Sequence, residues 1–257
     1  MPNLINEAAT PVVRSAGKTI ASIWDIVFGG IDVYSEKQRY LRELNLQKFK
    51  DSLTNKVEDI PTEDIQEPNL SIIGPTIEKS KYYFEDENLR ELFANLVASS
   101  IDKTKTEIVH PAYPDIIQNL SPNDAMFLKE ISSLEVIPFC MLRYQKRFKD
   151  NQTTFFSYFG DGITLSRCIL KYTYQENPFY DFNPTIDNLS RLKLIEVTDK
   201  FLSDESHYSD FLDNSIYKKC QSELSHDSQI MEREVTMIKG VIEVTSFGKN
   251  FIKTCVV

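Results

Sequence analysis

The residue types that bind transition metals are few in this chain and widely spaced. The histidines are His110, His207 and His226, and the cysteines are Cys140, Cys168, Cys220 and Cys255. No histidine has another histidine or a cysteine within four positions. Zinc sites usually draw on closely spaced pairs of these residues, and scattered cysteines are typical of buried, reduced thiols. We therefore expect no metal, no cofactor and a cytoplasmic location.

The motifs of common hydrolases and nucleotide-binding proteins are also missing. With 8 glycines, the sequence contains no G-x-S-x-G, G-x-G-x-x-G or G-x-x-x-x-G-K-[ST] pattern. Paired carboxylates do occur, Asp86 with Glu87 and Glu232 with Glu234, and such pairs can hold a divalent cation in a nuclease. They are also common on solvated surfaces. We expect that the protein is not an enzyme, and keep a metal-dependent nuclease as the second alternative.

The overall charge argues against a broad nucleic-acid-binding surface. The chain has 38 Asp and Glu residues against 29 Lys and Arg, a net charge of −9. Proteins that bind nucleic acid tightly neutralise several phosphates with clustered cations. Arg191 and Lys193, partly offset by Asp187, and Lys239 are the candidate nucleic-acid contacts. They support a DNA-binding regulator as the first alternative function.

The N-terminal segment carries the clearest candidate for a contact surface. Apolar residues recur every three or four positions from Asn3 to Val33, which predicts an amphipathic helix kinked near Pro11 and ended by two glycines. Its most apolar window is thirteen residues long, whereas a membrane span needs about 18 or more. Nor does the N-terminus resemble a signal peptide. The candidate contacts with a membrane or a partner are Ile20, Trp24, Val27 and Phe28.

Further helices are predicted up to about residue 135. A locally basic helix spans about 35–57, and an acidic linker with Pro61, Pro68 and Pro75 follows, with Pro75 expected in the first turn of the next helix. Two short helices come later, the second capped by Ser121. We divide this half into an amphipathic helical segment, 1–60, and a helical core, 61–135.

The remaining residues, 136–257, show a different pattern. Residues rich in β-branched and aromatic types predict strands near 135–148 and 153–159, with a turn at 160–162. A helix from Pro184 to Leu192 leads to a strand at 194–197. An acidic insertion, 199–234, follows and is expected to be helical near 208–224. A hairpin at Lys239–Gly240 and a final helix complete the order of a winged helix.

The predicted fold class is therefore α+β and mainly helical, with an N-terminal helical region followed by a winged-helix-like region. Four blocks of the sequence stand out: NLRELFANLVASSIDK from Asn88, HPAYPDIIQNLSPNDAMFLKEI from His110, NLSRLKLIEV from Asn188 and VTSFGKNFIKTC from Val244. These blocks resemble the abortive infection alpha family of bacterial proteins and occur in that family's order. Residues 151–180 and the acidic insertion depart from the family pattern.

The resemblance implies bacterial defence against phage by halting growth of the infected cell. It implies no reaction and no catalytic residue. Our leading hypothesis is a cytoplasmic phage-resistance protein that acts through contacts with a protein partner or as a homo-oligomer. In this hypothesis the N-terminal amphipathic helix engages a membrane surface on activation, whereas nucleic acid is not an expected partner.

Overall fold

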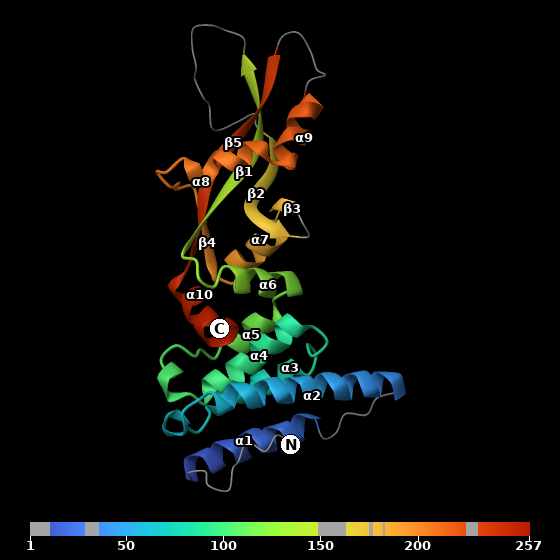
Figure 1. The fold of residues 1–257 in the computed structure, drawn as a ribbon, viewed down its shortest axis with the longest axis vertical. Helices are drawn as coiled ribbons and strands as arrows, with labels where there is room; N and C mark the ends of the chain where they lie inside the picture. Colours follow the sequence, from blue (N-terminus) through green and yellow to red (C-terminus); the bar gives the residue numbers. More distant parts are fainter. Residues whose placement is uncertain (1–10, 29–35, 149–162, 175–176, 182, 225–230) are drawn as a thin grey trace. The chain divides into compact units, whose positions relative to one another are not determined.

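The computed structural model describes residues 11–28, 36–148, 163–174, 177–181, 183–224 and 231–257. Contacts divide the chain into two compact units (Figure 1). The first unit contains residues 1–133 and 246–257, and the second contains residues 134–245. Residues 246–257, which we grouped with 136–257 from the sequence, thus pack with the N-terminal helices.

The first unit is a helical bundle centred on α4. Its elements are α1 (Pro11–Phe28), α2 (Glu36–Glu58), η1 (Thr62–Asp64), α3 (Leu70–Ser80), α4 (Glu87–Ser100), η2 (Lys103–Lys105), α5 (Tyr113–Gln118), α6 (Pro122–Glu130), α10 (Ser246–Phe251) and the π-helical turn η4 (Ile252–Val256). Helix α4 contacts α2, α3, α5, α6 and η4. Phe93, Leu96 and Val97 of α4 are completely buried, so this helix forms the core of the unit.

The helix starts follow local capping signals. The predicted Ser121 cap of α6 is confirmed, and Ser121 and Asp124 form a reciprocal capping box. The prediction that Pro75 lies in the first turn of α3 is wrong, because the helix begins at Leu70 and Pro75 is its sixth residue. Asn69 starts the helix early by accepting a hydrogen bond from the backbone N–H of Ser71. Pro75 then removes a single helical hydrogen bond, which α3 tolerates.

The second unit is built on a five-stranded sheet of order β3-β2-β1-β5-β4, in which every adjacent pair is antiparallel. Its elements are β1 (Val136–Phe148), β2 (Ile163–Tyr174), β3 (Asn177–Asp181), α7 (Asn183–Arg191), β4 (Ile195–Thr198), α8 (Ser206–Ser209), η3 (Asp210–Asp213), α9 (Ser215–Leu224) and β5 (Met231–Val244). The central strands β1 and β5 pair along their full length, from Val136 opposite Glu243 to Phe148 opposite Met231.

The hairpin predicted at Lys239–Gly240 is wrong. Both residues lie inside the continuous strand β5, opposite Cys140 and Phe139 of β1. A Cβ atom at Gly240 would collide with the Phe139 ring and lie 2.8 Å from the Thr198 carbonyl oxygen. The glycine therefore marks a close approach of neighbouring groups within a sheet, not a turn.

The mainly helical α+β class is confirmed, whereas the winged-helix arrangement is not. The helix near 183–191 and the strand after it match their predictions as α7 and β4. The strand predicted at 153–159 and the turn at 160–162 lie outside the described residues.

The acidic insertion supplies part of the hydrophobic core. Its predicted helical part is present as α8, η3 and α9. Tyr208 and Phe211 pack with Cys140, Leu142 and Ile169 of the sheet. The Tyr208 hydroxyl donates to the Gly240 carbonyl oxygen (3.1 Å) and accepts from the Leu202 N–H (3.1 Å). The insertion is thus anchored to the sheet by apolar packing, and to β5 by one buried hydrogen bond.

Candidate interaction site

Helix α1 buries one narrow face against its own chain. Ala16, Ile20 and Trp24, spaced four residues apart, are 2%, 3% and 5% exposed. This spacing places them on one side of an α-helix, and α1 contacts α3. Val27 is half-buried, and the side chain of Phe28 lies outside the described residues. The structure therefore brings two of the four predicted contact residues, Ile20 and Trp24, onto a covered face.

Trp24 occupies an aromatic site formed by α2. Its ring stacks on that of Phe49, with centroids 5.6 Å apart and planes inclined by 15°. The Phe49 ring in turn packs on Phe84, at 5.1 Å between centroids. The Lys50 ammonium lies 5.3 Å from the Trp24 ring centroid, a cation–π contact. Three rings in contact thus connect α1 to α2 and to the segment between α3 and α4.

A polar contact supplements this aromatic stack. The Thr19 hydroxyl donates to Glu67 Oε1 at 2.6 Å. Ser15, one turn earlier, also donates to this carboxylate, and the two hydrogen bonds hold the pKa of Glu67 below its ordinary value. Sequence reasoning missed Glu67, which stands in the Pro-interrupted acidic linker. The only available signal was the four-residue spacing of the two hydroxyls.

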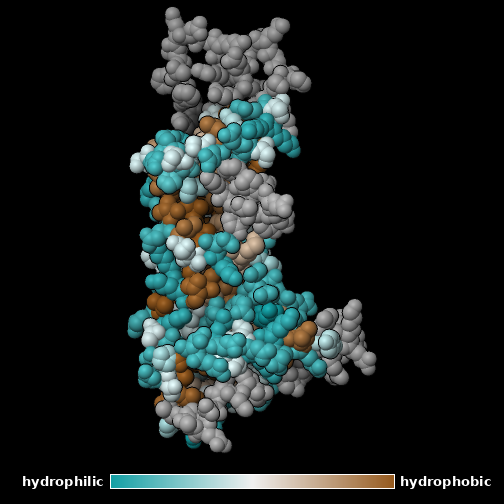
Figure 2. Space-filling view, in the orientation of Figure 1, coloured by the Kyte–Doolittle hydropathy of each residue, from teal (hydrophilic) through white to brown (hydrophobic). Residues whose placement is uncertain are grey.

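The outward side of this region is mostly polar. Figure 2 shows a largely hydrophilic visible face over α2, where Leu44 is 41% exposed. On α1 itself, Ile26 is 82% exposed. The main apolar face of α1 is the covered one, so binding another surface through this face requires the helix to leave its site.

The three candidate nucleic-acid contacts, Arg191, Lys193 and Lys239, each have a local structural role. Lys239 forms an ion pair with Glu205, and its ammonium lies 5.5 Å from the Tyr208 ring centroid. Arg191 donates from Nη2 to Asn188 Oδ1 at 2.7 Å, within α7. Ile186 and Leu189, the apolar residues that α7 buries, are not part of the core cluster that contains Tyr208.

Lys193 has a role in the backbone. Its φ angle is 60°, the left-handed region that residues other than glycine rarely adopt. The Lys193 N–H bonds the Ser190 carbonyl oxygen and the Leu194 N–H bonds that of Leu189, the two hydrogen bonds of a Schellman motif. Lys193 therefore ends α7 and turns the chain into β4.

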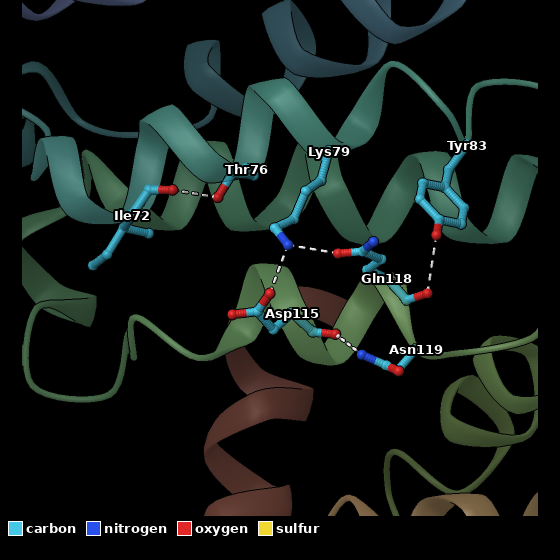
Figure 3. A network of polar contacts seen from close by, with 7 residues as sticks. All are labelled: Ile72, Thr76, Lys79, Tyr83, Asp115, Gln118 and Asn119. Atoms are coloured by element: carbon cyan, nitrogen blue, oxygen red, sulfur yellow. Dashed lines mark hydrogen bonds and ion pairs between the residues drawn. The ribbon is translucent and has the colours of Figure 1, made fainter.

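The polar residues between α3 and α5 form a structural network (Figure 3). Lys79 Nζ lies 2.6 Å from Asp115 Oδ1 and 2.5 Å from Gln118 Oε1. The Tyr83 hydroxyl donates to the Gln118 carbonyl oxygen at 3.0 Å. These contacts join α3 and the segment after it to α5. Lys79, the one cation in this network, is paired with Asp115.

The buried thiols are poor nucleophiles at neutral pH. Burial raises the pKa of Cys140 to about 12 and that of Cys255 further still. Burial likewise raises the pKa of Tyr113, which packs at 5.2 Å on Phe251. These groups serve packing in the two cores.

The predicted carboxylate pairs separate into different roles. Asp86 caps α4 by accepting from the Leu89 N–H at 2.9 Å, and Glu87 beside it is exposed. The side chains of Glu232 and Glu234 lie outside the described residues. Within the described residues, no group of three or more histidine, cysteine or acidic side chains is placed to hold a metal ion.

Fold and site together define a mainly helical α+β protein whose first described helix, α1, is docked on a helical bundle through Ala16, Ile20 and Trp24. The chain belongs to the abortive infection alpha family, since the family model matches residues 41–255. Helix α1 precedes the matched range. No curated protein and no solved structure gives a significant match. Among the described helices, none combines the length and the apolar character needed to cross a membrane.

Proposed function

We propose that this protein defends bacteria against phage by abortive infection, that it acts by binding and not by catalysis, and that α1 is its binding element. Membership of the abortive infection alpha family supports the defence role. The buried stack of Trp24 on Phe49 is the observation that carries the role of α1.

In the docked state the apolar face of α1 is covered by its own chain. An amphipathic helix that leaves such a site must cover the same face elsewhere, because exposed apolar surface is unfavourable in water. After release, the apolar face of α1 binds a protein partner, which includes a second copy of the chain. The interface of a lipid bilayer is the other surface with suitable chemistry, since Trp24 suits its boundary region.

Two features favour reversible docking. Outside the aromatic stack, α1 makes a polar contact with Glu67, an exposed carboxylate whose hydrogen bonds compete with water. Helix α1 ends at Phe28 and α2 begins at Glu36, so α1 stays joined to the bundle by the chain when it leaves its site. A signal of infection needs to overcome the docking free energy of one helix, not that of the bundle.

The proposal is tested in cells challenged with a panel of phages, with culture survival and membrane potential recorded together. Glu67→Ala removes the exposed acceptor and is expected to slow growth without phage, because α1 leaves its site more often. Trp24→Glu is expected to abolish protection, since the released helix then lacks its anchor residue. Glu63→Ala is the matched control, because the side chain of this exposed acidic residue forms no hydrogen bond or ion pair with a described residue.

Leakage of dye from liposomes distinguishes a membrane from a protein partner as the surface that α1 binds. Leakage that rises in Glu67→Ala and disappears in Trp24→Glu identifies the membrane as the target of α1. Protection without leakage identifies a protein partner. Full protection by a folded Trp24→Glu variant contradicts the role of α1 altogether.

A further inference from the structure

Arg90 of α4 is a buried cation without a counter-charge. Its side chain is 6% exposed, and its one hydrogen bond runs from Nη1 to the Phe84 carbonyl oxygen at 2.9 Å. Nε is completely buried and has no hydrogen-bond partner. An arginine stays charged at every physiological pH, and burying a charge without a partner is costly. The position of this residue therefore requires a physical explanation.

The free edge of the guanidinium is the one that recognises oxyanions. Nη1 is occupied by the Phe84 carbonyl oxygen, which leaves Nε and Nη2 without a hydrogen bond to any described residue. These two nitrogens present parallel N–H groups on one side of the planar group. Carboxylates and phosphates accept both hydrogen bonds at once in this geometry.

The neighbouring acidic residues do not neutralise this edge. Asp86 and Glu87 precede Arg90 by one helical turn, the spacing at which helical ion pairs form. The Asp86 carboxylate instead caps α4 through the Leu89 N–H, and neither acid forms an ion pair with Arg90. Glu91, the next residue, pairs with Lys56 at 3.0 Å and accepts from the Ser52 hydroxyl.

We propose that the Nε–Nη2 edge of Arg90 is a binding site for an oxyanion, a carboxylate or phosphate group, that completes the hydrogen bonding of this buried cation. Because Nε is buried, an oxyanion that binds this edge displaces the side chains that now cover it. Nη1 stays bonded to the backbone carbonyl of Phe84, whose ring is the last of the aromatic stack that holds Trp24. The inference is independent of the proposed function, since an anion at Arg90 neither requires nor excludes the release of α1.

Thermal unfolding of the full chain by circular dichroism tests the site. Sodium chloride is replaced at equal ionic strength by sodium phosphate or by sodium acetate, so that general screening is matched. We expect either anion, at a few-fold excess over its Kd, to raise the Tm of the native chain by about 2–4 °C more than chloride does. Phosphate also stabilises proteins non-specifically, so only the difference between variants counts.

Arg90→Lys keeps the charge but lacks the planar fork, and it is expected to lose this extra Tm shift. Arg191→Lys, at an exposed arginine bonded to Asn188, is the matched control and keeps it. A shift with phosphate alone assigns a phosphoryl ligand, and a shift with acetate also assigns a carboxylate. An equal shift in Arg90→Lys and the native chain, or no shift with either anion, overturns the site. Phage protection by Arg90→Lys is measured separately and reports on the proposed function.

Discussion

The indole ring of Trp24 lies almost parallel to the Phe49 ring, with 5.6 Å between their centroids. Helix α1 therefore joins the bundle through an aromatic contact that reaches Phe84 in one further step. Because Trp24 is the only tryptophan of the chain, its fluorescence reports directly on whether α1 is docked.

Replacing Trp24 by alanine should release α1 while the bundle stays folded. Truncation of a buried tryptophan typically costs about 3–5 kcal/mol, and here the loss falls on a single peripheral helix. A loss of about 3 kcal/mol raises the undocked population about 100-fold. Limited trypsin digestion after Arg14 and Lys18 should accelerate by a similar factor. Ile26→Ala, at a residue 82% exposed, should leave the rate unchanged; equal rates in both variants would mean that Trp24 does not hold α1.

Acid should loosen α1 through Glu67. The hydrogen bonds from Thr19 and Ser15 lower the pKa of this carboxylate from 4.5, so its contribution to docking is present above that pH and is lost as the pH falls below it. Trp24 fluorescence is expected to shift to the red on acidification, with a midpoint below pH 4.5. Glu67→Gln should flatten this transition. An identical transition in the variant would show that another group controls it.

Two glycine substitutions should differ in their effect on stability. Gly240→Ala forces the Phe139 ring to move, and we expect a loss of about 1–3 kcal/mol in the free energy of unfolding. Gly74→Ala adds a methyl group in α3 that meets no atom within 4 Å apart from its chain neighbours and the backbone of the helix. The next residue is Pro75, whose ring crowds a preceding Cβ in the helical conformation, so the gain expected from replacing a helical glycine is offset and stability should stay within about 1 kcal/mol of the native value. Urea denaturation measures both. A neutral Gly240→Ala would contradict the close approach of β1 and β5 at this position.

Removal of the Tyr208 hydroxyl should weaken the second unit. Tyr208→Phe leaves the Gly240 carbonyl oxygen and the Leu202 N–H without this partner, which costs about 1–3 kcal/mol. Tyr82→Phe, at a side chain 71% exposed, is the control and should be neutral. Both are compared by urea denaturation. Equal stability of the two variants would indicate that water satisfies the Gly240 carbonyl oxygen and the Leu202 N–H.

Local signals in the sequence were sufficient for most helices. The Ser121 cap, the periodic apolar residues of α4 and the helix that precedes β4 were all predicted, because capping and helical periodicity act over a few neighbouring residues. Gly240 shows where such reasoning fails. A glycine between two alternating segments indicates a turn when the chain is considered alone, whereas here it makes room for a ring 101 positions earlier in the chain.

The candidate site likewise combines features that local sequence predicts with features that depend on distant residues. The apolar stripe of α1 and its anchor Trp24 were evident from residue spacing, and so was the family resemblance that the match over residues 41–255 confirms. The identity of the surface that covers the stripe was not, and neither were the roles of Phe49 and Glu67.

The sequence alone predicts the helix-forming segments, the mainly helical class and the apolar face of α1, since each depends on residues close together along the chain. Only the tertiary structure decided that this face is covered by Phe49, that Lys239 pairs with Glu205 and that Arg90 is buried without a carboxylate. These contacts join segments that are distant in the chain. Which residues cover an apolar surface or pair with a charge depends on the packing of the whole unit.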